Sequence, residues 1–167
     1  ANKGVKVVLA EVKRQKLGPA QKINTFGELV CTNSLKSLNP DSGHGLLKNE
    51  MKALGSLILE MGHEHAVPAG DALAVDREKF SEAITKKLES HEHIEIIDKE
   101  VSDPIKLAAQ VGAEYIIVAS GPLTTEPLSQ WIMDNVGGED FYFYDAIAPV
   151  VDADSLDFSK MYFKDRH

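Results

Sequence analysis

The chain has 167 residues, of which 43% are apolar and 26% charged, and its formal charge is −8. This length suits one domain of roughly 100–200 residues, and the acidic excess excludes a surface that binds polyanions over its whole extent. No apolar run approaches the roughly 20 residues needed to cross a bilayer. The single cysteine, Cys31, excludes an internal disulfide and a cysteine-based zinc cluster. The start has no signal-peptide pattern, so we expect a cytoplasmic protein.

The charge is distributed unevenly along the chain. Residues 1–22 hold one acidic residue, Glu11, and these basic residues: Lys3, Lys6, Lys13, Arg14, Lys16 and Lys22. Residues 139–157 hold acidic side chains without basic partners. One interpretation is two solvated faces. The other is that the basic stretch lies beside the phosphates of a cofactor or of RNA.

The first half of the chain begins with a short β-branched run. Residues 5–10 are typical of a buried strand, and residues 12–27, with two glycines and a proline, of a loop. Apolar residues then recur every three or four positions from Leu46, which predicts one helix to about His65. Asp76 has the character of a helix N-cap, and flanking apolar residues fit a hydrophobic staple, so a second helix is expected to about Ser90.

The second half alternates between the two element types. Residues 94–97, 115–119 and 141–144 are predicted strands, whereas 104–111 and 125–136 are predicted helices. This alternation favours the α/β class with a largely parallel sheet. Such sheets bind ligands at the carboxyl ends of their strands.

Two residues stand out as candidates for chemistry, each with a plainer alternative. Glu11 follows the first strand, where dinucleotide folds place a ribose-binding carboxylate, but no glycine-rich phosphate turn precedes it, so it could be a surface residue. Cys31 is either an inert core thiol or a reactive one. The nearby Asn33 and Ser34 could orient a polar ring, although both are common turn residues.

The histidine pairs His63/His65 and His91/His93 lie at predicted helix ends with few carboxylates nearby. Histidine is favoured near a helix C-terminus by the helix dipole. We therefore expect no metal site.

Several longer blocks resemble one family, the folate- and FAD-dependent tRNA uridine-5-methyltransferases known as TrmFO (Gid). Residues 26–35 are similar to its F-A-E-L-V-C-S-N-S-L block, with Gly27 and Thr32 as departures. Residues 45–51 follow G-L-L-K-E-E-M, and residues 67–77 follow V-P-A-G-G-A-L-A-V-D-R with Asp71 in place of a glycine. Residues 119–124 follow A-T-G-P-L-T, and residues 138–149 follow G-E-D…F-Y-D-A-A-A-P.

The resemblance implies a partial FAD-binding, Rossmann-like domain of the glutathione-reductase type over residues 1–150, with 151–167 leading toward an insertion domain. It implies that Glu11 binds the ribose of FAD, that the turn at Val101 contacts adenine, and that Asn33 and Ser34 lie near the flavin ring. Ser120 and Gly121 would form a close backbone approach to the cofactor.

The family moves a methylene group from methylenetetrahydrofolate through FAD to the T-loop uridine at position 54 of tRNA, and NAD(P)H keeps the flavin reduced. Its members use two cysteines, and Cys31 matches the first, for which we favour proton abstraction. The same chemistry on ribosomal RNA and a non-catalytic nucleotide-binding module are the alternatives.

The family's glycine-rich phosphate loop would precede Ala1, and its second cysteine would follow His167. We therefore expect the isolated chain to bind FAD weakly or not at all and to be inactive. We also expect an exposed strand edge that permits self-association.

Overall fold

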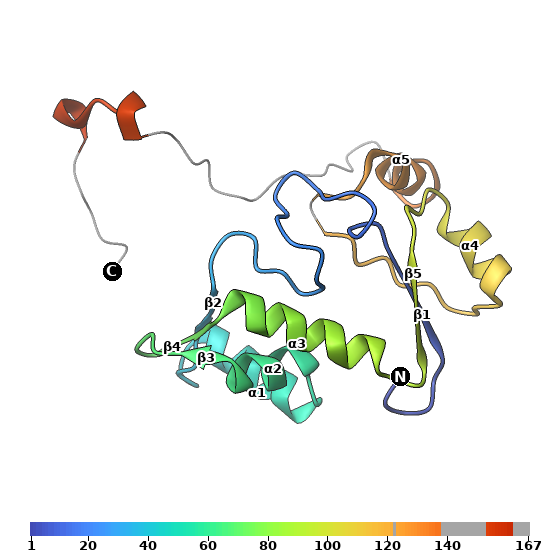
Figure 1. The fold of residues 1–167 in the computed structure, drawn as a ribbon, viewed down its shortest axis with the longest axis horizontal. Coiled ribbons are helices and arrows are strands. Elements are labelled where there is room, and N and C mark those ends of the chain that lie inside the picture. The colour runs from blue at the N-terminus through green and yellow to red at the C-terminus, as the bar shows by residue number, and fades with distance from the viewer. Residues whose placement is uncertain (122, 138–152, 162–167) are drawn as a thin grey trace.

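A parallel pair of strands forms the first sheet of the computed structural model, which describes residues 1–121, 123–137 and 153–161. Strand β1 (Val7–Glu11) lies beside β5 (Ile94–Asp98), with Val7 opposite Ile94 and Glu11 opposite Asp98 (Figure 1). Parallel pairing requires a crossover connection, and helices occupy the intervening chain. The predicted α/β class is confirmed.

A second, antiparallel sheet was not predicted from the sequence. Its strand order is β2 (Ser34–Ser37), β4 (Ala72–Val75) and β3 (Ala66–Val67). These strands have two to four residues, so the period-2 pattern has too few positions to be recognised. The sheet places the segment that follows Cys31 against β4.

Five α-helices lie in the described part of the chain: α1 (Gly43–Ala53), α2 (Leu57–Glu64), α3 (Arg77–Glu89), α4 (Pro104–Val111) and α5 (Glu126–Asn135). Two short 3-10 helices follow, η1 (Ala153–Ser155) and η2 (Phe158–Lys160). The single helix expected from Leu46 to His65 is wrong. Gly55 has a φ of 70°, a left-handed conformation that ends α1, and Ser56 then occupies the N-cap position of α2 without a side-chain capping bond. None of the described helices is long and apolar enough to span a bilayer.

The predicted starts of α3 and α4 are confirmed, and each has a side-chain cap. The Asp76 side chain accepts a hydrogen bond from the Lys79 N–H at the start of α3, and Val75 and Phe80 are both buried. At α4 the side chain of Asp103 accepts from the Lys106 N–H. The Asp76 cap and its apolar staple are as the sequence indicated, whereas the Asp103 cap was not predicted.

The core lies where α2, α3 and β4 meet the loop after β1. Its buried members are Phe26, Met61, Val75, Phe80 and Ile84. Phe26 belongs to the same loop as Cys31, and its side chain is 7% exposed. Burial of this ring therefore fixes the start of the cysteine-bearing segment to the body of the domain.

Two strand predictions need correction. No residue of β1 is fully buried, since β5 is its one neighbour within the described chain. Residues 115–119 form no strand, and Tyr115 and Ile117 are 86% and 90% exposed. A run of β-branched residues forms a strand when a neighbouring strand and a packing surface are present. No strand among the described residues pairs with residues 115–119. Residues 141–144 lie outside the described residues.

We predict that Gly27→Ala lowers the free energy of unfolding by roughly 1–3 kcal/mol. Gly27 has a φ of 71°, and an added Cβ would lie 2.6 Å from Cδ1 of Ile84. Urea unfolding measures the effect. Adding Ile84→Val, which removes Cδ1, should recover part of the loss.

Gly55→Ala is the matched control, because Gly55 has a similar φ of 70° with nothing within 4 Å of the added carbon. It should cost about 1 kcal/mol from backbone strain alone. Equal losses at Gly27 and Gly55 would contradict a close approach between the cysteine-bearing segment and α3.

Candidate functional site

Glu11 ends β1 with a carboxylate that is partly exposed. Its Oε1 accepts a hydrogen bond from the Lys13 N–H at 3.0 Å, and its backbone carbonyl accepts from the Lys99 N–H at 2.9 Å. A carboxylate offers about four lone-pair sites. Glu11 is thus oriented by its own turn and keeps the capacity to accept hydrogen bonds from ligand hydroxyls.

A small cavity of about 170 Å³ lies at the turn after β5. Its lining residues come from that turn and from α4: Lys99, Glu100, Val101, Ser102, Asp103, Lys106, Leu107 and Gln110. Because Glu11 pairs with Asp98 in register, the cavity and Glu11 belong to the same end of the parallel sheet. Whole ligands occupy roughly 300 Å³ or more, so this cavity suits one part of a dinucleotide.

Cys31 is exposed, which excludes the inert-core interpretation. The guanidinium of Arg77, at the start of α3, donates a hydrogen bond from Nη2 to the carbonyl oxygen of Cys31 at 3.2 Å. The main chain of Cys31 is therefore held by α3 while its side chain meets solvent. A thiol presented in this way is accessible to a substrate.

Asn33 and Ser34 shape the turn that follows. The side-chain amide of Asn33 donates to the Val75 carbonyl at 3.1 Å, and the Val75 N–H donates to the Asn33 carbonyl at 2.9 Å. Ser34 Oγ accepts from the Lys36 N–H at 3.0 Å. Both side chains already bond to the backbone, which agrees with the turn interpretation, and a place near a flavin ring stays a prediction.

Ser120 and Gly121 form a tight polar turn. Ser120 Oγ lies 2.7 Å from Thr124 Oγ1, which donates to the Gly121 carbonyl at 2.6 Å. Gly121 has a φ of 75°, and nothing lies within 4 Å of an added Cβ. The backbone is thus open to an approaching ligand. Within the described chain, no hydrogen bond or ion pair joins this turn to Glu11, Val101 or Cys31.

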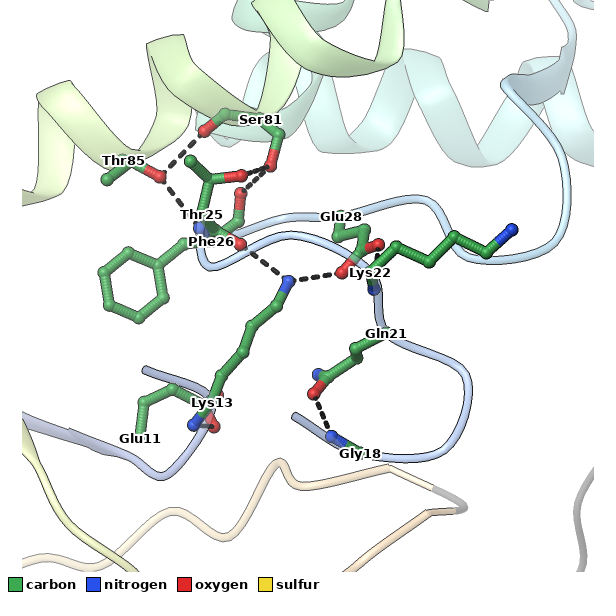
Figure 2. A network of polar contacts seen from close by, with 10 residues as sticks. All are labelled: Glu11, Lys13, Gly18, Gln21, Lys22, Thr25, Phe26, Glu28, Ser81 and Thr85. Carbon is green, nitrogen blue, oxygen red and sulfur yellow. Dashed lines mark hydrogen bonds and ion pairs between the residues drawn. The ribbon is translucent and has the colours of Figure 1, made fainter. Parts of the chain in front are cut away.

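A buried ion pair that the sequence did not reveal links the Glu11 turn to the Cys31 segment (Figure 2). Lys13 Nζ lies 2.6 Å from Glu28 Oε2, with the two side chains 4% and 9% exposed. The same ammonium donates to the Thr25 carbonyl at 2.7 Å, and Glu28 Oε1 accepts from the Lys22 N–H at 2.8 Å. The only sequence signal was that Glu28 lies in the F-G-E-L-V-C block.

The same segment is bonded to α3. The Phe26 N–H donates to Thr85 Oγ1 at 2.8 Å, and Ser81 Oγ donates to the Phe26 carbonyl at 2.8 Å. Thr25 Oγ1 and Ser81 Oγ are 2.5 Å apart, and Figure 2 shows the Thr25 and Ser81 side chains facing each other. These bonds satisfy the polar groups of a loop that would otherwise be costly to bury.

The basic stretch at the start divides into two kinds of side chain. Lys13 is buried in its ion pair, and Arg14 lies 4.6 Å above the Phe26 ring and pairs with Glu89. Lys13 and Arg14 therefore belong neither to a solvated face nor to a site beside phosphates, because both side chains make contacts within the fold. The other basic residues of the stretch are exposed: Lys3, Lys6, Lys16 and Lys22.

We predict that the Glu28 carboxyl makes the stability of the fold depend on pH at pH values below 4.5, the ordinary pKa of a glutamate side chain. Burial raises the pKa of this carboxyl, but the hydrogen bond and charge of Lys13 and the N–H of Lys22 outweigh it, so the pKa is lowered. A group whose pKa is lowered in the folded state stabilises the fold at pH values above its pKa in the unfolded chain. That stabilisation is lost as the pH falls through the pKa of the group in the folded state. In urea unfolding, the difference between the native chain and Glu28→Gln should shrink below about pH 4.5; a constant difference would contradict the buried charge.

No cluster of three potential metal ligands occurs among the described residues. The rings of His91 and His93 lie 5.9 Å apart, and His91 Nε2 bonds to the side chain of Asn2 at 2.9 Å. These histidines take part in local contacts.

Comparison with known proteins identifies relatives along the full chain. A model of the family described as glucose inhibited division protein A matches residues 1–167. A protein of Persephonella marina named methylenetetrahydrofolate–tRNA-(uracil-5-)-methyltransferase TrmFO is 50% identical over 167 residues, and one of the same name from Aquifex aeolicus is 47% identical. The chain spans 37% and 36% of their lengths. It belongs to the glucose inhibited division protein A family.

Proposed function

We propose that this chain is part of a flavin-dependent methyltransferase that modifies the 5-position of a T-loop uridine in tRNA. The observation that carries the proposal is the exposed, α3-held thiol of Cys31 in a chain whose relatives are named as tRNA (uracil-5-)-methyltransferases. A cytoplasmic location follows from the proposed tRNA substrate.

The residues at the end of the parallel sheet fit the adenosine half of FAD. A carboxylate at the end of a strand suits ribose hydroxyls, and Glu11 has acceptor capacity beyond its bond to Lys13. The cavity lined by Val101 is of a size for one part of the cofactor. Bound FAD would carry the one-carbon unit from methylenetetrahydrofolate to the base, and NAD(P)H would keep the flavin reduced.

Cys31 would act on the base itself. Carbon 5 of uracil becomes nucleophilic once a thiolate adds to carbon 6, and a base must later remove the proton from carbon 5. Cys31 lies in the block that resembles the one around the family's first cysteine, and we propose that it performs one of these tasks. We assign it the second: its thiolate takes the proton as an S–H bond, and the electron pair of the broken C–H bond stays on the ring.

The test of flavin binding uses the whole protein, meaning this chain within a polypeptide of the length of its relatives. Glu11→Ala should weaken FAD binding by roughly tenfold or more, because it removes hydrogen bonds to a charged acceptor. Glu95→Ala, which changes an exposed carboxylate on β5, is the matched control and should not. Unchanged FAD affinity in Glu11→Ala would overturn the assignment.

The substrate is tested with labelled methylenetetrahydrofolate and a tRNA transcript. We expect label in a transcript that carries the T-loop uridine and none when cytidine replaces it. Label in ribosomal RNA but not in tRNA would favour the alternative substrate, and label in neither would overturn the proposed reaction.

A further inference from the structure

We infer that Lys13 is a positioning residue that couples the cofactor end of β1 to the segment bearing Cys31. This inference rests on the proposed function, in which Glu11 meets the ribose and Cys31 meets the base. Lys13 touches neither ligand in that scheme. It acts by joining the two parts of the chain that do.

The first link is made by the backbone of Lys13. Its N–H donates to Glu11 Oε1 at 3.0 Å, so the orientation of the Glu11 carboxylate and the conformation of residues 11–13 depend on one another. A ligand that donates hydrogen bonds to this carboxylate therefore acts on the turn that carries Lys13.

The second link is made by the side chain of Lys13. The ammonium contacts Glu28 Oε2 at 2.6 Å and the Thr25 carbonyl at 2.7 Å. With the Lys13 side chain 4% exposed and that of Glu28 9% exposed, little water can replace either partner. Movement of the turn after β1 must then be followed by residues 25–28 or leave a buried charge unpaired, which is costly.

The third link carries the coupling to the thiol. Glu28 lies three residues before Cys31 in a segment held at Phe26 by Ser81 and Thr85 of α3. Arg77 of the same helix holds the Cys31 carbonyl. Glu28 lies between these two attachment points, so a displacement at Glu28 would reach Cys31 through three residues of backbone.

The chemistry of the pair favours positioning over stability. A buried ion pair is often no more stabilising than apolar side chains of similar volume. It is specific in position, however, because the ammonium donates a hydrogen bond to the Thr25 carbonyl and lies 2.6 Å from Glu28 Oε2, two contacts at different points of the loop. An apolar pair would fill the space without fixing the distance between the Glu11 turn and the Cys31 segment.

The test uses ADP as the probe in the flavin-free whole protein, because bound FAD would occupy the adenosine site. ADP carries the adenosine ribose but no flavin ring, so any effect on Cys31 must pass through the protein. We expect saturating ADP to slow the alkylation of Cys31 by iodoacetamide about fivefold or more, the lower end of coupling between interacting sites. The double variant Lys13→Met with Glu28→Gln leaves no unpaired buried charge. In this variant the rate of Cys31 alkylation without ADP, divided by the rate with ADP, should approach one.

Two further variants separate positioning from a merely structural role. Lys13→Arg restores a cation and should restore much of the ADP effect, whereas a general loss of stability would not be cured in this way. Lys16→Met removes an exposed lysine of the same loop and should leave the ADP effect unchanged.

The outcomes are distinct. An undiminished ADP effect in the folded double variant, or no ADP effect in the native protein at saturation, overturns the role of Lys13 while leaving the methyltransferase proposal intact. Failure of ADP to bind at all overturns the adenosine site and this inference with it. Loss of the ADP effect in the double variant, with rescue in Lys13→Arg, supports the coupling.

Discussion

Cys31→Ala in the whole protein should reduce methyl transfer to tRNA by roughly 10²–10⁴-fold, the contribution expected of a positioned general base. The sulfur is the group that would take the proton from carbon 5 of the uracil, and alanine offers no acceptor. Flavin binding should persist, because Glu11 and the cavity at Val101 belong to a different part of the chain. Labelled methyl incorporation and flavin absorbance measure the two effects separately.

Two variants control this experiment. Val30→Ala changes an exposed neighbouring residue, which is 39% exposed, and should retain activity. Cys31→Ser keeps the size of the side chain but raises the pKa of the acceptor far above that of a thiol, so it should be nearly as inactive as alanine. Full activity in Cys31→Ala with flavin still bound would remove the thiol from the mechanism.

Lys13→Met should lower the free energy of unfolding by roughly 3–5 kcal/mol, since removing one partner of a buried pair leaves the other charge uncompensated. Glu28 would keep the Lys22 N–H but lose the ammonium at 2.6 Å. The Thr25 carbonyl would also lose its donor. Urea unfolding of the flavin-free protein measures the effect.

Adding Glu28→Gln to Lys13→Met should recover most of this loss, because no buried charge remains and the carbonyl oxygen of the introduced amide can still accept from the Lys22 N–H. The recovery distinguishes an electrostatic cause from lost packing of the lysine stem. If the double variant is as unstable as Lys13→Met alone, the cost lies in packing. Lys16→Met, at an exposed position of the same loop, should be close to neutral.

Local signals predicted the elements that have caps or clear periodicity. Asp76 marks the start of α3 because a side-chain acceptor near the first turn is a property of the local sequence. The break at Gly55 was missed because the apolar spacing continues into α2. The run 115–119 was predicted as a strand from its residue types, but pairing depends on a partner that its own sequence does not encode.

The candidate site divides in the same way. Glu11 and Cys31 were found because each stands in a recognisable place, after a strand or inside an unusual block. Lys13 and Glu28 were missed because their contact joins residues 15 positions apart across an irregular loop. Their residue types gave no hint of burial, since lysine and glutamate are usually exposed.

The most direct test of the account is a crystal structure of the whole protein with FAD bound. We predict that a Glu11 carboxylate oxygen lies roughly 2.6–3.2 Å from a ribose hydroxyl of the adenosine half, and that the Cys31 sulfur faces the flavin ring. A cofactor whose ribose lies away from the end of β1, or a Cys31 sulfur turned away from the ring, would contradict it.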